Sequence, residues 1–169
     1  IQPDGNILVG GMFSHVGGTQ RNCFARMNST GTLDSTFDLM TDNTVLSIAV
    51  QADGKIMFGG NFSSAGGATR NHLARVNPNG ALDTNFNPDV NQEVQSLAQS
   101  ADGKIFVGGS FSSLGGSPRN LFARLINDSP VQTLTTLDST QISWTRGGSA
   151  PEITLVSFEH SIDSGATWT

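Results

Sequence analysis

The first candidates for chemistry are acidic residues in two polar stretches of the chain, residues 38–44 and 87–93. The acids in these stretches are Asp38, Asp42, Asp89 and Glu93. Paired carboxylates placed in loops can act as the general acid and base of a hydrolase. Because loops carry function more often than strands, we expect any glycan or small-molecule site of this chain to lie in these two stretches.

Metal and thiol chemistry have less support in the sequence. The chain has three histidines and one cysteine: His15, His72, His160 and Cys23. The histidines share no metal-ligand spacing and a lone cysteine adds no ligand pair, so we expect no metal site and no cofactor. Cys23, His72 and Leu121 occupy equivalent positions of an internal repeat. We predict a packing position there, with Cys23 as an inert small hydrophobe rather than a nucleophile.

The elements that must position these residues come from a repeat with a period of 49 residues. Residues 2–28 align without a gap with residues 51–77 and again with residues 100–126. Glycine, the default residue where φ is positive or where backbones approach closely, recurs at fixed positions of the repeat. The repeated aspartates and glycines include Asp4, Gly5, Gly10, Gly11, Asp53, Gly54, Gly59, Gly60, Asp102, Gly103, Gly108 and Gly109. Each of these glycines is expected to mark a turn or a close contact.

The repeat predicts β-hairpins. Asp-Gly between two apolar runs is a strong hairpin signal, and the Asp-Gly pair at 53–54 joins residues 45–51 to residues 56–58. A second hairpin is predicted to turn at residues 78–80 and to return through residues 82–86. Each repeat then has four short strands, and no window shows the periodicity of a helix. The turn aspartates cap their own backbone, and their spacing offers no cluster of oxygens for calcium.

Arginine also recurs in the repeat. Two columns hold Arg21, Arg70 and Arg119, and then Arg26, Arg75 and Arg124. A guanidinium presents five donors in a rigid fork, which suits it to tie loop carbonyls or carboxylates together. Because a catalytic or ligand-clamping arginine need not recur in every repeat, we expect both columns to be structural.

Four strands in each repeat of this length are typical of a β-propeller blade. The motif DGKIxxGGxFxxxGGxxRNxxARxN resembles the delta-60 repeat, a bacterial β-propeller family with no assigned biochemical activity, and the resemblance covers residues 1–126. Members of that family are usually parts of long exported proteins. The resemblance therefore implies a secreted or cell-surface location, although no leader segment opens this chain.

We therefore expect an all-β domain, residues 1–126, with three four-stranded propeller-type blades at about residues 1–44, 45–93 and 94–126. The alternative is a β-trefoil, which also has three units of four strands. Propellers typically have about four to eight blades, so three blades form an open arc with uncovered ends. Uncovered ends favour association, and two copies would close a ring as a homodimer.

A second module is expected at residues 127–169, where the repeat stops and both tryptophans lie. Alternating strands around Trp144 make this segment similar to the first half of a fibronectin type III or immunoglobulin-like sandwich. Residues 161–168, SIDSGATW, match the Asp-box pattern S-x-D-x-G-x-T-W known from sialidases. In those families the box is a structural hairpin, so we predict no sialidase activity from it.

Composition excludes other functions. Nine Lys and Arg against fourteen Asp and Glu give a net charge of −5, which disfavours nucleic-acid binding, and no apolar run is long enough to span a membrane. We expect no enzyme but a structural spacer or protein-interaction platform within a larger bacterial surface or secreted protein. The alternative is a carbohydrate-binding module, followed by part of a glycan-active enzyme, so protein partners and glycans are both considered.

Overall fold

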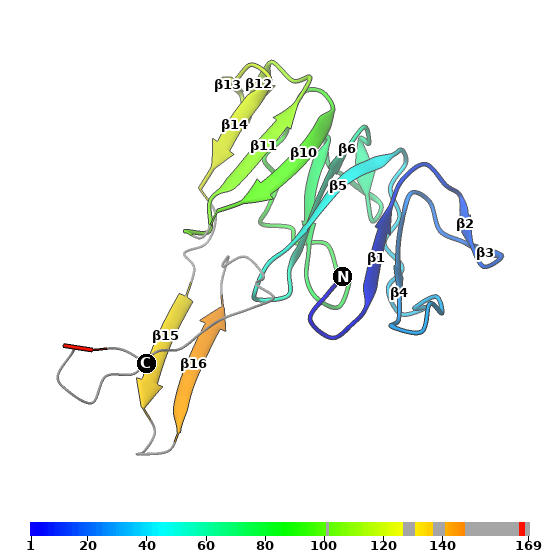
Figure 1. The fold of residues 1–169 in the computed structure, drawn as a ribbon. Coiled ribbons are helices and arrows are strands. Elements are labelled where there is room, and N and C mark those ends of the chain that lie inside the picture. The colour runs from blue at the N-terminus through cyan, green and yellow to red at the C-terminus, as the bar shows by residue number, and fades with distance from the viewer. Residues whose placement is uncertain (101, 127–130, 137–140, 148–165, 168–169) are drawn as a thin grey trace.

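The computed structural model describes residues 1–100, 102–126, 131–136, 141–147 and 166–167, and it contains strands but no helix in this part of the chain. Figure 1 shows three small antiparallel sheets side by side, which we call blades 1, 2 and 3. The all-β prediction is confirmed. No closed barrel forms among the described residues, so the structure does not support the β-trefoil alternative.

Each blade has a main sheet and a small hairpin whose two strands have two residues each. Blade 1 consists of β1 (Ile7–Gly10), β2 (His15–Val16), β3 (Thr19–Gln20) and β4 (Phe24–Met27). Blade 2 consists of β5 (Val45–Val50), β6 (Ile56–Gly60), β7 (Ser64–Ala65), β8 (Ala68–Thr69) and β9 (Leu73–Val76). Blade 3 consists of β10 (Val94–Gln99), β11 (Ile105–Gly109), β12 (Ser113–Leu114), β13 (Ser117–Pro118) and β14 (Phe122–Leu125).

The main sheets follow the predicted hairpins. In blade 2 the strand order is β5-β6-β9, with Ile48 opposite Phe58 and Phe58 opposite Ala74. The turn between β5 and β6 needs a glycine because Gly54 has φ +78°, and the Asp53 carboxylate accepts a hydrogen bond from the Lys55 amide at 3.0 Å. The Asp-Gly signal therefore identified the correct turn.

In the first two repeats the fourth strand is reduced to one bridge. Leu33 pairs with Met27, and Leu82 pairs with Val76, but no ladder continues from either pair. After Leu82 the backbone turns back, with the Phe86 amide donating to the Asp83 carbonyl at 3.2 Å. The main sheet of blade 2 thus has three strands where we expected four, because the fourth segment anchors apolar side chains rather than extending the sheet.

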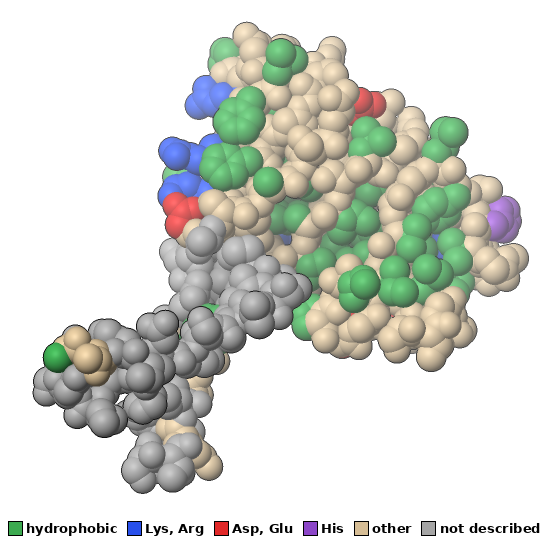
Figure 2. Space-filling view, viewed as in Figure 1, with side chains coloured by type: hydrophobic (Ala, Val, Ile, Leu, Met, Phe, Trp, Pro, Cys, Tyr) green, Lys and Arg blue, Asp and Glu red, His purple; other side chains and the backbone are tan. Residues whose placement is uncertain are grey.

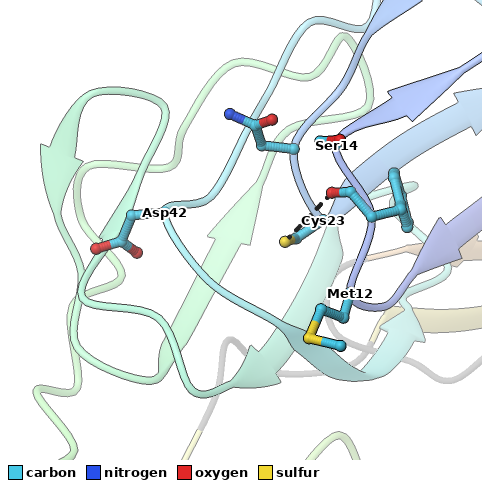
Figure 3. A pocket seen from close by; sticks show the side chains of 6 residues that line it. Met12, Ser14, Cys23 and Asp42 are labelled. Carbon is cyan, nitrogen blue, oxygen red and sulfur yellow. Dashed lines mark hydrogen bonds between the residues drawn. The ribbon is translucent and has the colours of Figure 1, made fainter.

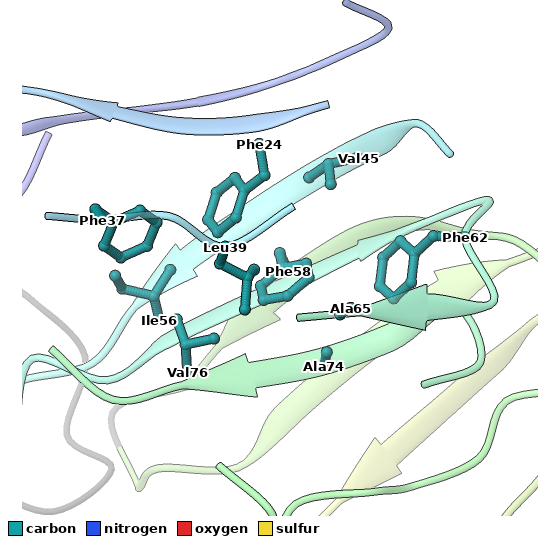
Figure 4. Close-up of a cluster of buried hydrophobic side chains, with 10 residues drawn as sticks. All are labelled: Phe24, Phe37, Leu39, Val45, Ile56, Phe58, Phe62, Ala65, Ala74 and Val76. Atoms are coloured by element: carbon teal, nitrogen blue, oxygen red, sulfur yellow. The ribbon is translucent and has the colours of Figure 1, made fainter. Parts of the chain in front are cut away.

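Two hydrophobic cores lie between successive blades. The first joins blades 1 and 2, where the Phe24 ring stacks on Phe58 with centroids 4.7 Å apart and meets Phe37 edge-on at 5.6 Å (Figure 4). The second joins blades 2 and 3 and contains Leu73 and Val94, both fully buried. Blade 2 therefore packs one face against blade 1 and the other face against blade 3.

The paired glycines at the ends of the central strands leave room for neighbouring backbone. A Cβ atom on Gly60 would lie 2.0 Å from the Thr44 carbonyl oxygen, and one on Gly109 would lie 2.1 Å from the Glu93 oxygen. Both distances are far below van der Waals contact. Glycine at this column is required by the close approach of the segment that leads into each of these two blades.

Beyond the blades the structure describes one hairpin. β15 (Val131–Thr136) pairs with β16 (Ile142–Gly147), and Trp144 lies in β16 opposite Leu134. Figure 1 shows this hairpin apart from the three blades. Most of the Asp-box, residues 161–168, and the remainder of the predicted half-sandwich lie outside the described residues, so the second module stays a prediction.

Candidate functional site

The first candidate site is an open cavity of about 470 Å³ beside blade 1 (Figure 3). It is lined by Met12, Phe13, Ser14, Asn22, Cys23 and Asp42. The Cys23 thiol is buried and donates to the Phe13 carbonyl oxygen at 3.6 Å, and no general base is bonded to it in the part of the chain that the structure describes. The cavity thus lies between blade 1 and the segment that leads into blade 2.

Asp42 is the one predicted acid that lines this cavity, and its carboxylate is committed to the backbone. It accepts hydrogen bonds from the Ser63 and Ser64 amides, both at 2.9 Å, and from the Ser63 hydroxyl. Although burial acts to raise the pKa of Asp42, these hydrogen bonds hold it below its ordinary value. The carboxylate fixes the leading segment to the small hairpin of blade 2.

The equivalent residue in blade 3 is Asn91, whose side-chain oxygen accepts the Ser112 amide at 3.0 Å and the Ser113 amide at 2.9 Å. A neutral amide therefore makes the same contacts that Asp42 makes in blade 2. This column needs an oxygen acceptor and does not need an acid. The geometry favours a structural role for Asp42 over general acid or base catalysis.

The other predicted acids also have local partners. Asp38 pairs with Arg21 at 3.1 Å, Asp89 accepts from the Asn71 amide nitrogen at 2.8 Å, and Glu93 accepts from Gln95 at 2.9 Å. Among the described residues, no hydrogen bond or ion pair joins the acids of 38–44 to those of 87–93. The structure therefore distributes the predicted ligand residues over two separate loops instead of gathering them in one site.

No group of three histidine, cysteine, aspartate or glutamate side chains is placed to hold a metal ion in the part of the chain that the structure describes. The His15 ring nitrogen lies 3.0 Å from the Ser14 hydroxyl, and the His72 ring nitrogen lies 3.2 Å from the Gly60 carbonyl oxygen. His160 lies outside the described residues.

The inner arginine column begins with Arg26, which ties blade 1 to blade 2. Arg26 donates to the Asp34 carboxylate at 2.8 Å and to the Pro78 carbonyl of the following repeat at 2.8 Å, and it stacks 4.5 Å from the Phe37 ring centroid. A hydrogen bond from Thr36, together with the bonds from Arg26, lowers the pKa of Asp34 to about 2. These contacts join the fourth segment of the repeat and the following blade to β4, and the structural role of the column stays a prediction.

Arg75 repeats the contacts with a carboxylate and an aromatic ring in blade 2. It bonds the Asp83 carboxylate at 2.9 Å and stacks 4.5 Å from the Phe86 centroid. In blade 3 the column residue is Arg124, which is exposed and has no such partner among the described residues.

The outer arginine column contacts its own backbone. Arg21, Arg70 and Arg119 each donate to the carbonyl oxygen of the preceding residue, at 2.7–2.8 Å. Arg21 and Arg70 are buried, whereas Arg119 is exposed in blade 3. Blade 3 is therefore the one of the three in which both arginine columns face outwards.

The outward face of blade 3 holds a second cavity, of about 410 Å³, lined by Phe106, Arg119, Phe122, Ala123 and Arg124. The Phe106 and Phe122 rings stack with centroids 5.9 Å apart. Phe122 is 59% exposed, whereas Phe24 and Leu73, its equivalents in blades 1 and 2, are 0% exposed. Figure 2 shows apolar and basic side chains together along the β14 edge of the molecule. We call these five residues the blade 3 end face.

Cys23 is buried, in agreement with the predicted packing position, but its column also forms a turn that we did not predict. Cys23, His72 and Leu121 share a left-handed backbone, with φ of 62°, 64° and 64°, and Leu121 is 64% exposed. In each repeat the backbone amide of the residue after this position donates to the carbonyl oxygen of the residue before it, as from Phe122 to Asn120 at 2.7 Å. Three different non-glycine residues gave no sequence signal for this conformation.

Comparison with known proteins gives one match. The sequence model of a family described as "Domain of unknown function (DUF5122) beta-propeller" matches residues 2–37, 51–86 and 100–129. These segments are in step with the repeat, and the match confirms the prediction of propeller-type repeats. No curated protein and no solved structure matches the chain.

Proposed function

Because this chain belongs to the DUF5122 β-propeller family, we propose that it is a non-catalytic repeat module that serves as a structural spacer or a protein-interaction platform. We place it in a larger bacterial surface or secreted protein, on the resemblance to exported repeat proteins. The observation that carries the proposal is the exposure of Phe122, at 59%, in a column that is fully buried in the other two blades. A face built for blade-to-blade contact is thus open to a partner.

The contacts of the acidic residues support the non-catalytic part of the proposal. Asp42 is held by backbone amides, and Asn91 makes the same contacts without a carboxyl group. Asp38 is paired with a buried arginine. A hydrolase would need two carboxylates that face one reacting bond, and these acids serve the scaffold instead.

The simplest partner for the blade 3 end face is another copy of the chain, which would bring blade 3 of one copy towards blade 1 of the other and form a homodimer. We expect light scattering to give an average mass above the 17.7 kDa of one chain. This average mass should rise with protein concentration. Phe122→Ser removes the exposed ring and should reduce this association.

Leu46→Ser is the matched control for Phe122→Ser. Leu46 is also an exposed apolar residue, at 47%, but it lies on β5 in blade 2 and outside the end face. The Leu46→Ser variant should leave the association unchanged. A clean monomer at every concentration, for the parent and both variants, would reject a homodimer through this face.

A carbohydrate-binding module is the second candidate, and the stacked pair of Phe106 and Phe122 beside Arg124 is the observation that favours it. Exposed aromatic rings offer a flat apolar surface on which sugar rings pack. A glycan array distinguishes the candidates. Binding by the parent chain that is lost in Phe122→Ser and kept in Leu46→Ser would favour the carbohydrate module, and an array without binding would favour the platform.

A further inference from the structure

A turn at the surface joins β9 to the fourth segment of the second repeat. It contains Asn79, which is exposed and is followed by Gly80, with φ +87°. No other asparagine of the chain precedes a glycine. Asparagine is chemically labile, because the carbon of its side-chain amide is an electrophile close to the next backbone nitrogen. A following glycine leaves that nitrogen uncrowded by any side chain.

Two hydrogen bonds fix this turn. The Gly80 amide donates to the Asn77 carbonyl oxygen at 2.8 Å, and the Ala81 amide donates to the side-chain oxygen of Asn79 at 3.0 Å. The second bond folds the Asn79 side chain back over the peptide group that joins it to Gly80. The electrophilic carbon and the nitrogen that can attack it are therefore held in neighbouring positions of one ordered turn.

The Asp-Gly turns of the repeat have the same geometry with a different chemical group. The Gly54 amide donates to the Gln51 carbonyl oxygen at 2.8 Å, and the Asp53 carboxylate accepts the Lys55 amide at 3.0 Å. The turns at residues 4–5 and 102–103 repeat both bonds. A carboxylate that is ionised at neutral pH resists attack by a nitrogen. Asn79 thus has a neutral carboxamide where these turns have an unreactive carboxylate.

The hydrogen bond from Ala81 also lowers the barrier to attack. Negative charge develops on the side-chain oxygen of Asn79 when a nitrogen adds to the adjoining carbon, and a backbone amide that already points at this oxygen stabilises the charge. The opposing contact is the bond from the Gly80 amide to Asn77, which must open before the nitrogen can lose its proton. Because Asn79 lies at the surface, water and hydroxide reach the turn when this bond opens.

We propose that Asn79 is a site of spontaneous deamidation. The Gly80 nitrogen gives its proton to hydroxide and forms a bond to Cγ of Asn79. The bond from Cγ to Nδ2 then breaks, and the amino group takes a proton from water and leaves as ammonia. The product of this step is a cyclic imide.

Water opens the cyclic imide at one of two carbons. Addition of water at Cγ leaves aspartate at position 79. Addition at the backbone carbonyl carbon leaves isoaspartate, in which the main chain passes through Cβ and Cγ. Either route consumes one water and releases one ammonia, and no group is oxidised or reduced.

The modified turn lies at the contact between blades 1 and 2. The Pro78 carbonyl oxygen accepts a hydrogen bond from the Arg26 guanidinium at 2.8 Å. A Cβ atom on Gly80 would lie 2.9 Å from the ring of Phe37, which is fully buried in the first core (Figure 4). The turn is therefore fitted closely against the first repeat.

The two products affect this contact differently. Aspartate keeps the length of the main chain and matches the Asp-Gly turns, so the contact persists. Isoaspartate adds one atom to the main chain, which moves Gly80 against Phe37 or withdraws the Pro78 carbonyl from Arg26. Formation of isoaspartate therefore loosens the contact between the first two blades.

The test is incubation of the folded 169-residue chain at mildly alkaline pH, with samples taken over time for peptide mapping by mass spectrometry. We expect the peptide that contains Asn79 to gain the mass difference between an amino and a hydroxyl group, and fragmentation to place this gain at position 79. The rate should rise in proportion to the hydroxide concentration. Asn28 and Asn43 also bind backbone amides but precede serine and threonine, so they should stay unchanged in the same samples.

Asn79→Thr is the matched variant, because Thr30 stands at the equivalent position of the first repeat, before Gly31 with φ +84°. The variant keeps the turn and removes the electrophile, so it should gain no mass at this position and should melt like the fresh parent. Asn79→Asp represents the aspartate product and should also melt like the fresh parent. The aged parent, in which isoaspartate has formed, should melt at a lower temperature than both variants.

Two results would overturn the deamidation site: no gain of mass at position 79 in the folded chain, or a gain no faster than that at Asn28. A gain that occurs only in urea would do the same, because the bond from Gly80 to Asn77 would then protect the folded turn. An aged parent that melts like Asn79→Thr would reject the loosening of the blade contact. None of these results bears on the platform role, which is tested separately at Phe122.

Discussion

At the residue scale, the tightest constraint is at Gly60. Replacement by alanine would place a methyl carbon 2.0 Å from the Thr44 carbonyl oxygen, so the leading segment of blade 2 must move. We expect Gly60→Ala to lower the free energy of unfolding by about 1 to 3 kcal/mol, as overpacking does elsewhere. Thermal unfolding followed by circular dichroism measures the loss.

Gly67→Ala is the control for this substitution. A Cβ atom on Gly67 would have no other atom within 4 Å, so the variant reports only the cost of a side chain at φ +77°. It should destabilise less than Gly60→Ala. Equal melting temperatures for Gly60→Ala and the parent would contradict the close approach of Thr44.

The left-handed column offers a stabilising change at the same scale. Leu121 has φ 64° and is 64% exposed, so it carries backbone strain and contributes little packing. Strain there costs about 1 to 2 kcal/mol, whereas glycine adds about 0.5 to 1 kcal/mol of chain entropy. We expect Leu121→Gly to raise the free energy of unfolding by up to about 1 kcal/mol in urea denaturation.

Ile126→Gly serves as the comparison for Leu121→Gly. Ile126 is 90% exposed and is not among the described residues with positive φ. It should lower stability or leave it unchanged. A loss of stability in Leu121→Gly would show that the leucine side chain contributes more than its backbone costs.

The sequence predicted residue roles where side-chain chemistry is local. Asp53 and Gly54 identified a turn because aspartate caps such turns and glycine accepts positive φ. The sequence predicted Asp42 as a ligand residue because it does not reveal the partners of the carboxylate. These partners, Ser63 and Ser64, are distant in sequence and meet Asp42 only after folding. A lone carboxylate in a polar loop does not reveal whether backbone amides already occupy it.

At the element scale, the inner arginine column holds the fourth segment of the first two repeats against its blade. The Arg75 and Asp83 side chains are 6% and 8% exposed, and their pair is stabilised by the Phe86 ring. Arg75→Gln should lower the free energy of unfolding by about 1 to 3 kcal/mol, since it leaves the buried Asp83 carboxylate with the longer ion pair to Lys55, at 3.5 Å. Urea denaturation checks the value.

Arg124→Gln is the matched control, because Arg124 occupies the same column in blade 3 and has no partner among the described residues. It should leave the denaturation midpoint close to that of the parent. If both variants lost the same stability, the contacts with Asp83 and Phe86 would not explain the column.

Strands were predicted well where the apolar pattern was long enough. β5 and β6 have five or six residues and follow the Asp-Gly hairpin. The two-residue strands β7 and β8 have no periodicity of their own, so only their turn glycines marked them. The returning strand was predicted to be longer than it is. Leu82 and Phe86 are apolar because they pack against the hydrophobic cores, and not because they extend the sheet.

At the scale of the whole molecule, lowered carboxyl pKa values predict sensitivity to acid. The pKa of Asp34 is about 2, and those of Asp42 and Asp83 also lie below the ordinary value. A group whose folded pKa is lowered stabilises the protein above its unfolded pKa, about 3.9, and loses that contribution as pH falls towards the folded value. We expect a constant melting temperature above about pH 5 and a decline from about pH 4 to pH 2.

Asp83→Asn tests this assignment. The variant should be less stable at neutral pH, because the asparagine cannot pair with the Arg75 charge. Its melting temperature should then fall less steeply than that of the parent between about pH 4 and pH 2. Parallel curves for the two proteins would show that Asp83 does not contribute to the acid response.

Blade 2 is the one described blade with a hydrophobic core against each of its faces, since Phe58 lies in the first core and Met57 in the second. In a row of repeats that contact only their neighbours, opening begins at the ends and moves inwards. The β6 amides would therefore exchange their hydrogens with solvent last, and those of β1 and β14 earlier. Protection of a blade's amides from hydrogen exchange would therefore increase with the number of blades that pack against it.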